Sequence, residues 1–569
     1  MVKACRHCQQ NFEVTDTDLK FLEKISPVFS GKKYLVPSPT LCPDCRQQRR
    51  LAFRNERNLY RRKSSLSEQE IISIYSKEKP YTVYSQEEWW SDTWDGLEYG
   101  REFNFSELFF AQFQKLSLEV PRVSLINNTA ENSPYCNFAD GNKNCHLVIN
   151  SNWNQDSLYS TLILNCPNVS DAFWVLDSEL CYECVDSEKC YDVKFSRECH
   201  ECRNSAFLSE CRSCKNCLGC VNLRNKSYHI WNEPVTPEAF EQKITELENW
   251  GNLQKFAQEF AAFVQTKPHP STHSLQSEDI LGDHLSRCHN AFHCFDGFDS
   301  ESCTQMYDFV KCKNCTDGNS IDSGELCYEN TSLIGYGNSF TAYCRDSSGL
   351  FYCWDCHSCQ DCFGCIGLQH KKYCLLNREY SKEQYEELLP KIIEHMMKTP
   401  LLSPLTGGKE GGQEWGEFFP VVISPFGYNE TTAQEYFPLS QEQVREQKWQ
   451  WKEPENPDFS GVTKKIPAEK LPEIITEIPD DILNWAITCE ISKKPFRIQK
   501  AELEFYRKMN LPIPHHHPDI RHEQRMVLRN PRRLWQRNCD NCKKKIETTY
   551  APDRPEIIYC EECYLQTVY

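Results

Sequence analysis

The residues best suited to chemistry are cysteines that occur in closely spaced pairs towards both ends of the chain. One set comprises Cys5, Cys8, Cys42 and Cys45, and the other comprises Cys539, Cys542, Cys560 and Cys563. Each Cys-x2-Cys pair can turn both sulfurs towards one ion, and two pairs complete the tetrahedron that zinc prefers. Because four thiolates leave no open position for a water molecule, the spacing predicts two structural zinc ions in two zinc ribbons. An iron–sulfur centre or a redox dithiol is the alternative.

A third copy of the ribbon has lost most of its cysteines. The segment CEISKKPFRIQKAELEFY, which begins at Cys489, aligns with CRHCQQNFEVTDTDLKFL, which begins at Cys5. Further along, HHPDIRHEQRMVLRNPRRLWQR aligns with LCPDCRQQRRLAFRNERNLYRR, so the four ligand positions hold Cys489, Ser492, His517 and Ile520. Cys489 and His517 could still coordinate a metal, with help from His515, His516 or His522. The alternative is a ribbon that has lost its metal and survives by packing.

Arginines with helical spacing follow two of the three ribbons. They are Arg46, Arg50, Arg54, Arg57 and Arg61 in the first set, and Arg521, Arg525, Arg529 and Arg532 in the second. Spacings of three or four residues place each set on one face of a predicted helix. Guanidinium groups bind phosphates, so these arginines are candidate contacts to RNA, to a ribonucleoprotein or to another macromolecular partner. The alternative is that they dock onto the acidic remainder of the same chain.

The middle of the chain is a nine-residue repeat. Residues 132–230 divide without a gap into eleven nonapeptides, whose fifth position is most often cysteine. The eighth position, taken every eighteen residues, gives Cys166, Cys184, Cys202 and Cys220. Since equivalent positions of a solenoid stack on one another, this column predicts a β-solenoid with eighteen residues per coil. The stacked thiols are expected to be buried and inert, with local metal binding or oxidation chemistry as alternatives.

The repeat block occurs twice, and each copy is followed by a predicted helix. The segment that begins at Ser213 matches the one that begins at Ser358 with an offset of 145, whereas ELCYE recurs with an offset of 146. We therefore expect a second solenoid over 287–375 with one extra residue near its middle. Thr236 and Pro237 should begin the first helix, and a capping box of Ser381 and Gln384 should begin the second.

Composition sets the class of protein. The chain has 569 residues, a formal net charge of −17 and 34 cysteines. This length requires several folding units, and the acidic balance excludes a surface that is basic all over. The sequence shows neither a signal peptide nor an apolar run of membrane-spanning length, so we expect a cytoplasmic protein with reduced thiols. Phosphate-loop, dinucleotide, HExxH and GxSxG motifs are absent, and no small-molecule substrate is indicated.

The predicted architecture is multidomain and mainly β. In chain order it comprises a zinc ribbon with an arginine-rich helix (1–63), an aromatic and acidic connector (64–131), β-solenoid A (132–230), a helical linker (231–286), β-solenoid B (287–375), a capping helix (376–399), an irregular segment (400–480), the degenerate zinc ribbon with its arginine-rich helix (481–537) and the C-terminal zinc ribbon (538–569).

The chain resembles a family of large uncharacterised cysteine-rich zinc-ribbon proteins of candidate phyla radiation bacteria. The segments that carry the resemblance are LCPDCRQQRRLAFRNERNLYRR, GCVNLRNKSYHIWN and TTYAPDRPEIIYCEECY. It implies a cytoplasmic zinc-binding protein. In that family the middle ribbon looks like a full four-cysteine site, so Ser492, His517 and Ile520 are departures.

These observations favour a non-enzymatic zinc-binding scaffold or interaction protein whose macromolecular partner is a protein, a ribonucleoprotein or nucleic acid. The alternative is a thiol-redox or metal-buffering protein that uses its cysteine-rich repeats.

Overall fold

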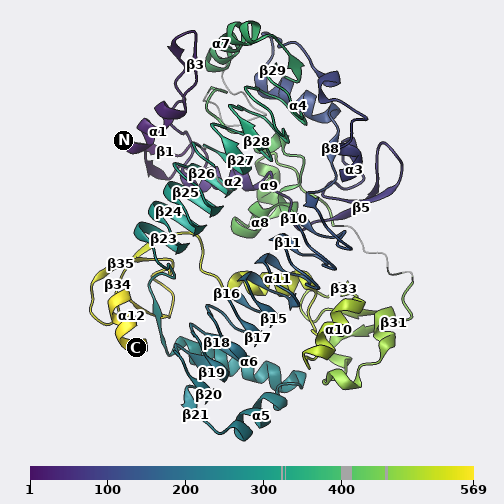
Figure 1. Ribbon diagram of the computed structural model, residues 1–569, viewed down its shortest axis with the longest axis vertical. Helices are drawn as coiled ribbons and strands as arrows, with labels where there is room; N and C mark the ends of the chain where they lie inside the picture. The colour runs from purple at the N-terminus through teal and green to yellow at the C-terminus, as the bar shows by residue number, and fades with distance from the viewer. Residues whose placement is uncertain (322–323, 327, 399–412, 455–458, 460) are drawn as a thin grey trace. The chain divides into compact units, whose positions relative to one another are not determined.

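The chain folds into two compact units built from interleaved segments. The computed structural model describes all residues except 322–323, 327, 399–412, 455–458 and 460 (Figure 1). Unit 1 contains Met1–Leu125, Thr272–Glu453 and Arg532–Leu534, and unit 2 contains Ile126–Ser271, Pro454–Pro531 and Trp535–Tyr569. Parts of the predicted capping helix and of the predicted irregular segment therefore lie outside the described residues. Within the described part of the chain, no helix combines the length and the apolar composition that a membrane span requires.

Unit 2 contains a stack of short parallel strands, which we call array A. One sheet has the order β16-β14-β12-β11-β10-β9, and a second has the order β13-β15-β17-β18-β19-β20-β21. The strands are β9 (Asn127–Asn128), β10 (Asn137–Asp140), β11 (Ile149–Asn152), β12 (Thr161–Leu164), β13 (Val169–Ser170), β14 (Phe173–Leu176), β15 (Glu179–Tyr182), β16 (Val185–Glu188), β17 (Tyr191–Lys194), β18 (Arg203–Ser209), β19 (Lys215–Val221), β20 (Ser227–Ile230) and β21 (Glu233–Pro234). The prediction of repeated short strands in this region is confirmed.

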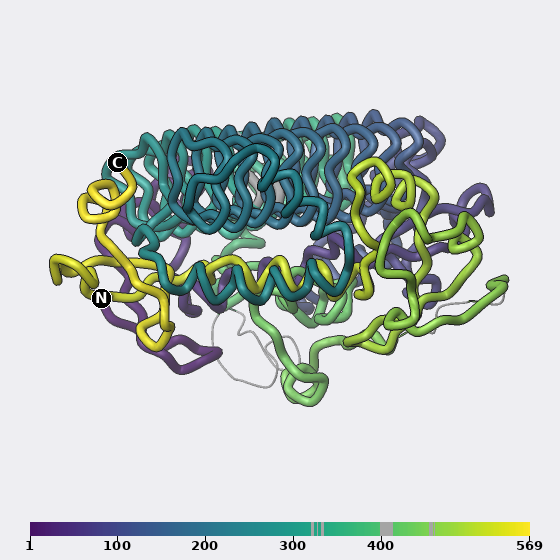
Figure 2. The backbone as a smooth tube through the Cα atoms, turned by 90° about the horizontal axis from the view of Figure 1, so that it is seen from below, coloured from purple at the N-terminus to yellow at the C-terminus, as the bar shows by residue number. Residues whose placement is uncertain are grey.

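The predicted coil of eighteen residues is wrong, because each coil of array A advances by twelve. Val169 pairs with Cys181, Cys181 with Val193, and Val193 with Ser205. Cys184 consequently stacks between residues 172 and 196 rather than beside Cys202. Figure 2 shows the closely stacked turns of the backbone.

A turn at every third residue explains the twelve-residue coil. Leu180, Glu183, Asp186 and Lys189 all have φ between 47° and 55°, the left-handed conformation that bends the backbone sharply. The residue after each bend points inward, so inward positions also recur every third residue, as in the buried set Cys181, Cys184, Ser187, Cys190, Val193 and Ser196. Four such triplets close one coil. Nine is also a multiple of three, which is why the sequence repeats at nine although the backbone closes at twelve.

Unit 1 contains the second stack, array B. Its strands are β23 (Glu278–Ser286), β24 (His289–Phe298), β25 (Glu301–Val310), β26 (Thr316–Ile321), β27 (Asn330–Tyr336) and β28 (Arg345–Ser348), and single bridges continue the stack to Leu375. Most pairs are offset by twelve residues, but Glu325 pairs with Tyr336, eleven residues later. The prediction of one extra residue in array B is therefore wrong. Array B has one residue fewer at this point, and its register shifts between Ile334 and Gly335.

Helices pack against both arrays. Thr236 caps α5 (Pro237–Glu246), as predicted, and α6 (Trp250–Gln265) follows. Phe256 and Phe260 of α6 pack against Phe207 of array A. In unit 1, Ser381 and Gln384 exchange the two hydrogen bonds of the predicted capping box at the start of α7 (Lys382–Lys398). Tyr385 of α7 packs against Tyr373 near the end of array B.

Short elements complete both units. In unit 1 they are β1 (Val2–Ala4), β2 (Asn11–Glu13), α1 (Asp16–Ile25), β3 (Val28–Phe29), β4 (Lys32–Lys33), α2 (Pro43–Leu51), β5 (Tyr60–Lys63), β6 (Glu70–Ser73), β7 (Val83–Tyr84), α3 (Gln86–Trp89), η1 (Gly96–Tyr99), α4 (Phe109–Glu119), β8 (Arg122–Val123), β29 (Cys374–Leu375), β30 (Arg378–Glu379), η2 (Val421–Ile423), η3 (Tyr428–Glu430), α8 (Thr432–Tyr436) and α9 (Gln441–Glu446). In unit 2 they are β22 (Pro268–Pro270), β31 (Lys464–Pro467), η4 (Ala468–Lys470), η5 (Ile475–Glu477), η6 (Asp480–Asn484), β32 (Trp485–Thr488), β33 (Pro495–Phe496), α10 (Lys500–Lys508), α11 (Pro518–Val527), β34 (Trp535–Asn538), β35 (Lys545–Thr548), β36 (Ile557–Tyr559) and α12 (Glu561–Val568).

Candidate metal centres

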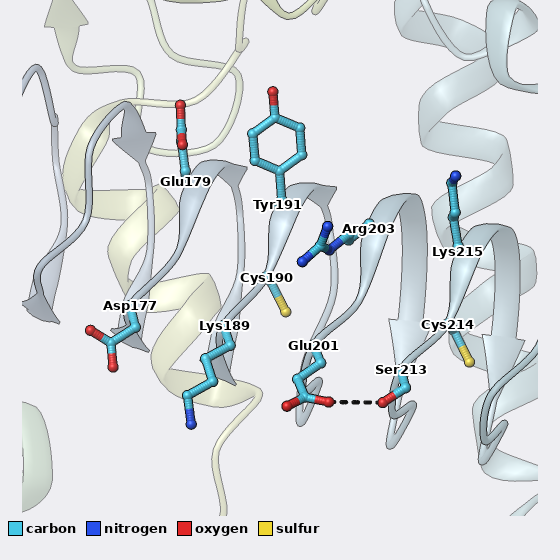
Figure 3. A pocket seen from close by; sticks show the side chains of 10 residues that line it. All are labelled: Asp177, Glu179, Lys189, Cys190, Tyr191, Glu201, Arg203, Ser213, Cys214 and Lys215. Atoms are coloured by element: carbon cyan, nitrogen blue, oxygen red, sulfur yellow. Dashed lines mark hydrogen bonds between the residues drawn. The ribbon is translucent and has the colours of Figure 1, made fainter.

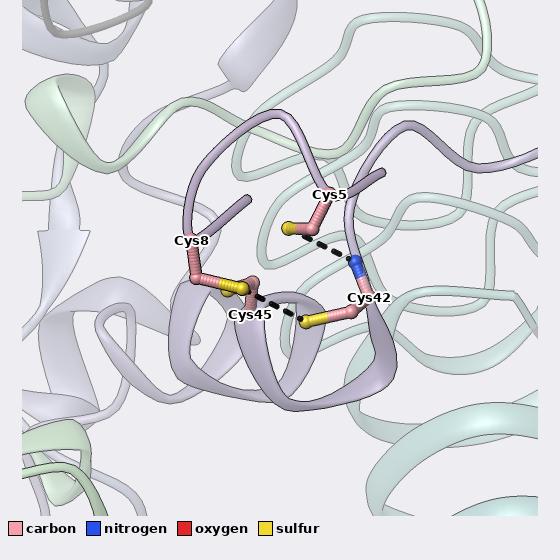
Figure 4. A group of neighbouring side chains, drawn as sticks. All are labelled: Cys5, Cys8, Cys42 and Cys45. Carbon is pink, nitrogen blue, oxygen red and sulfur yellow. Dashed lines mark hydrogen bonds between the residues drawn. The ribbon is translucent and has the colours of Figure 1, made fainter. Parts of the chain in front are cut away.

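The four cysteines of the N-terminal ribbon converge on one point. All four Sγ atoms lie within 4.8 Å of one another, and those of Cys8 and Cys42 are 3.7 Å apart (Figure 4). A tetrahedron with Zn–S bonds of about 2.3 Å has edges of about 3.8 Å, so the spacing fits zinc. Cys42 caps α2 and Pro43 occupies its first turn, so this helix begins at a ligand residue.

The C-terminal ribbon repeats this arrangement. The Sγ atoms of Cys539, Cys542, Cys560 and Cys563 also lie within 4.8 Å of one another, and those of Cys542 and Cys560 are 3.7 Å apart. Cys560 caps α12, as Cys42 caps α2. The predicted four-cysteine clusters are therefore confirmed, and each can hold one metal ion.

Hydrogen bonds favour the thiolate form, which metal binding requires, at one cysteine of each cluster, Cys42 and Cys539. The backbone N–H of Cys42 donates to Cys5 Sγ, and that of Cys560 donates to Cys539 Sγ, both at 3.3 Å. Burial alone would raise the pKa of Cys539, but hydrogen bonds from the backbone N–H groups of Cys560, Cys542 and Asn541 outweigh it and lower the pKa to about 6. The hydrogen bond with the Cys45 thiol is the main cause that lowers the pKa of Cys42 to about 5.

The middle ribbon keeps the backbone of the other two but only one of the four sulfur ligands, Cys489. Cys489 N–H donates to Lys494 O, the same bond that joins Cys5 to Gln10 and Cys539 to Lys544. His517 caps α11 at the position of Cys42, and its Nδ1 accepts from the backbone N–H of Asp519. Among the described residues, neither Cys489 nor His517 belongs to a group of three converging metal ligands.

The candidate helper histidines of this ribbon make contacts of their own. His515 stacks on Trp250 with ring centroids 4.1 Å apart and bonds to Glu490, and His516 Nδ1 lies 3.1 Å from Gln524 Oε1. His522 is buried near Phe173.

Arginines of the N-terminal ribbon are buried against array B. Arg46 Nη2 lies 2.8 Å from Asp317 Oδ2, and Arg50 Nη1 lies 3.4 Å from Asp317 Oδ1. Arg49, which the helical spacing did not single out, pairs with Glu329 and with Glu417. The exposed fractions of Arg46, Arg49 and Arg50 are 5%, 8% and 0%. These three side chains therefore dock the ribbon onto its own unit.

The middle ribbon docks onto array A through equivalent residues. Arg521 pairs with Asp171 and with Glu502, while Arg525 Nη1 lies 2.9 Å from Asp171 Oδ1 and 3.3 Å from Glu183 Oε1. In the alignment of the ribbons, Arg521 matches Arg46 and Arg525 matches Arg50. The array offset of 146 carries Asp171 onto Asp317 and Glu183 onto Glu329. Each array and its ribbon thus form one copy of a duplicated module.

The remaining candidate arginines lie beyond the helices. Since α2 ends at Leu51 and α11 at Val527, neither set occupies a single helix face as predicted. Arg54 is buried and pairs with Glu56, Arg57 is half-buried and Arg61 is exposed on β5. Arg529 Nε lies 2.8 Å from Asp186 Oδ2, and Arg532 Nη2 lies 2.7 Å from Asp296 Oδ2.

The array thiols donate hydrogen bonds as serines do at equivalent positions. Cys184 Sγ lies 3.3 Å from the carbonyl oxygen of Val193, and Ser157 Oγ lies 2.9 Å from that of Cys166. Burial raises the pKa of the Cys166 thiol to about 12, which keeps it neutral near pH 7. At Cys365 the balance differs, since hydrogen bonds from Cys353 and Cys362 overcome burial and lower the pKa of this thiol to about 6.

Comparison with known proteins adds little. No protein-family model and no curated protein matches the chain. Among solved structures, the chain is similar to a protein from Desulfovibrio desulfuricans G20 described as a "putative acetyltransferase", with 9% identity and a TM-score of 0.11. The match covers 40% of this chain and 63% of that protein. A likeness this weak carries no argument about activity.

Proposed function

We propose that the protein is a non-enzymatic, zinc-binding scaffold whose arrays bind a macromolecular partner. The observation that carries this proposal is the closure of both four-cysteine clusters. Four thiolates around one zinc ion leave no position for a substrate or an activated water. A ligand residue also begins the helix that docks the N-terminal ribbon onto array B, so the ion supports the docking surface.

Zinc content tests the first half of the proposal. The purified protein, freed of weakly bound ions by gel filtration, should contain two zinc ions per chain. Cys8→Ser and Cys542→Ser should each lose one ion, whereas Cys184→Ser, inside array A, should lose none. A protein that folds without zinc would contradict the proposal. Many more than two ions would favour the metal-buffering alternative, for which the contacts among Cys353, Cys362 and Cys365 offer the ligands.

The outward side of array A offers a surface for a partner. Two rows of side chains flank a trough of about 700 Å³, one with Asp177, Lys189, Glu201 and Ser213 and the other with Glu179, Tyr191, Arg203 and Lys215 (Figure 3). Because the coil repeats at twelve residues, neighbours in a row are about 4.8 Å apart. Asp177 and Glu179 lie at one end and Arg203 and Lys215 towards the other. This pattern suits an extended protein segment with acidic side chains near Arg203 and Lys215.

A capture experiment tests the second half. The zinc-loaded protein should retain the same partner proteins from lysate with and without ribonuclease, and Arg203→Glu/Lys215→Glu should lose them. Lys243→Glu, which reverses the charge of an exposed side chain on α5, is the control and should retain them. Loss of the partners after ribonuclease treatment would favour a nucleic-acid partner and reject a protein partner. We propose a protein partner because Arg46, Arg50, Arg521 and Arg525, the candidate phosphate contacts, are buried in ion pairs.

A further inference from the structure

Two histidines lie together at the first coil of array B. His284 belongs to β23, and His273 lies in the segment before it. Leu275 pairs with Ser286, so this coil has eleven residues and stacks residue 273 on residue 284. The two imidazole rings are stacked, with centroids 4.9 Å apart and an angle of 13° between their planes. One ring nitrogen of each histidine lies within 4.8 Å of the other.

A buried carboxylate orients this pair. Asp283 Oδ1 accepts from the backbone N–H of His273 at 2.6 Å and from that of His284 at 3.0 Å. Its Oδ2 lies 3.4 Å from His273 Nδ1, and its Oδ1 lies 3.9 Å from His284 Nδ1. The contact between Asp283 Oδ2 and His273 Nδ1 favours a proton on that nitrogen, which places the lone pair of the His273 ring on Nε2.

This arrangement has the chemistry of a metal site. Imidazole nitrogens are ligands for zinc, nickel and copper, and two nitrogens bound to one zinc ion are about 3.3 Å apart. The rings of His273 and His284 must therefore rotate about their side-chain torsions for one nitrogen of each to bind the same ion. The next member of the same column is Asp296, which pairs with Arg532, so its negative charge is already balanced.

We propose that His273 and His284 together bind one divalent transition-metal ion, with Asp283 as the positioning residue that fixes the ring orientation. Two imidazole nitrogens fill only part of the coordination of such an ion, which needs further ligands to complete it. The site is independent of the four-cysteine clusters, because all of its residues lie at the start of array B. It also differs from those clusters in chemistry, since two imidazoles bind far more weakly than four thiolates and leave positions open.

Titration of the full-length, zinc-loaded protein with Zn²⁺ or Ni²⁺ tests the proposal. Calorimetry should show one further equivalent beyond the two held by cysteines. His284→Ala should weaken this binding at least tenfold, and Asp283→Asn should weaken it by about 10- to 100-fold. His289→Ala, which removes an exposed histidine from the neighbouring strand β24, is the matched control and should leave it unchanged.

The rival explanation is an imidazolium–carboxylate pair with a purely structural role. In that case no further equivalent binds, or it binds equally well to the His284→Ala protein, and either result overturns the proposal. Since His284 is only partly buried, His284→Ala should remain folded, and its content of cysteine-bound zinc reports this directly. Loss of that zinc in the wild type would contradict the scaffold proposal but leave the histidine site untouched.

Discussion

Replacement of Asp171 by asparagine is predicted to loosen the middle ribbon from array A. Asp171 is fully buried and faces both Arg521 and Arg525, whose exposed fractions are 2% and 1%. Removal of one partner from a buried ion pair costs about 3–5 kcal/mol, because the other charge stays buried without compensation. Asparagine keeps the shape and one acceptor, and Glu502 and Glu183 remain, so we expect the lower limit of about 3 kcal/mol.

Urea unfolding of the wild type, Asp171→Asn and Asp177→Asn measures this cost. Asp177 is an exposed carboxylate of the same array that accepts a hydrogen bond from the side chain of Asn165 at 2.9 Å, so its loss should change the free energy of unfolding by less than about 0.5 kcal/mol. Hydrogen exchange should show lost protection in α11 for Asp171→Asn alone. Equal stability of the two variants would refute the assignment of the buried pairs as the docking force, as would a double-mutant cycle with Arg525→Met that shows no coupling.

Three further predictions follow from the structure. Cys184→Asp should destabilise array A by more than about 4 kcal/mol because it buries a charge. Cys184→Ser should have a small effect, since Ser160 and Ser196 occupy the same column as Cys184, and so should Glu188→Lys. Unfolding followed by circular dichroism tests these differences. Burial lowers the pKa of His146 to about 4, so the unfolded chain binds a proton that the folded chain lacks. The free energy of unfolding should therefore fall by at most about 3 kcal/mol as pH drops from about 6.5 to about 4, and His146→Gln should remove this slope in pH-dependent denaturation. Finally, Ser492→Cys/His517→Cys/Ile520→Cys should add one zinc ion per chain, with Cys489 as the fourth ligand, and an unchanged zinc content in elemental analysis would contradict the equivalence of the ribbons.

The metal clusters could be predicted from sequence because their geometry is local. A Cys-x2-Cys pair defines its own turn, and pairing two of them requires only that the chain return, as it does at Cys42 and Cys560. The docking arginines were visible as a spacing, but their acidic partners were not. Asp171 and Asp317 are more than 260 residues from Arg521 and Arg46, and only the alignment of the two arrays marks them as equivalent.

The coil size could not be obtained from residue types alone. An inward position at every third residue produces columns at any multiple of three, and the cysteine-rich series at eighteen is one of them. Backbone pairing determines the coil length, because the strands of neighbouring coils hydrogen-bond at an offset of twelve residues, as in the pairing of Val193 with Ser205. The left-handed turns that close the coil fall on residues such as Leu180 and Trp174, whose types do not favour that conformation.

The three-residue side of the coil also limits which insertions the arrays can tolerate. An insertion of three residues keeps every inward side chain inward, but it shifts all later outward side chains by one side of the coil. A single-residue change instead moves inward side chains to outward positions, and array B accommodates such changes where its register shifts, beside Gly282 and beside Gly335. The surface of such a protein can thus be rearranged wholesale in evolution while its interior stays the same.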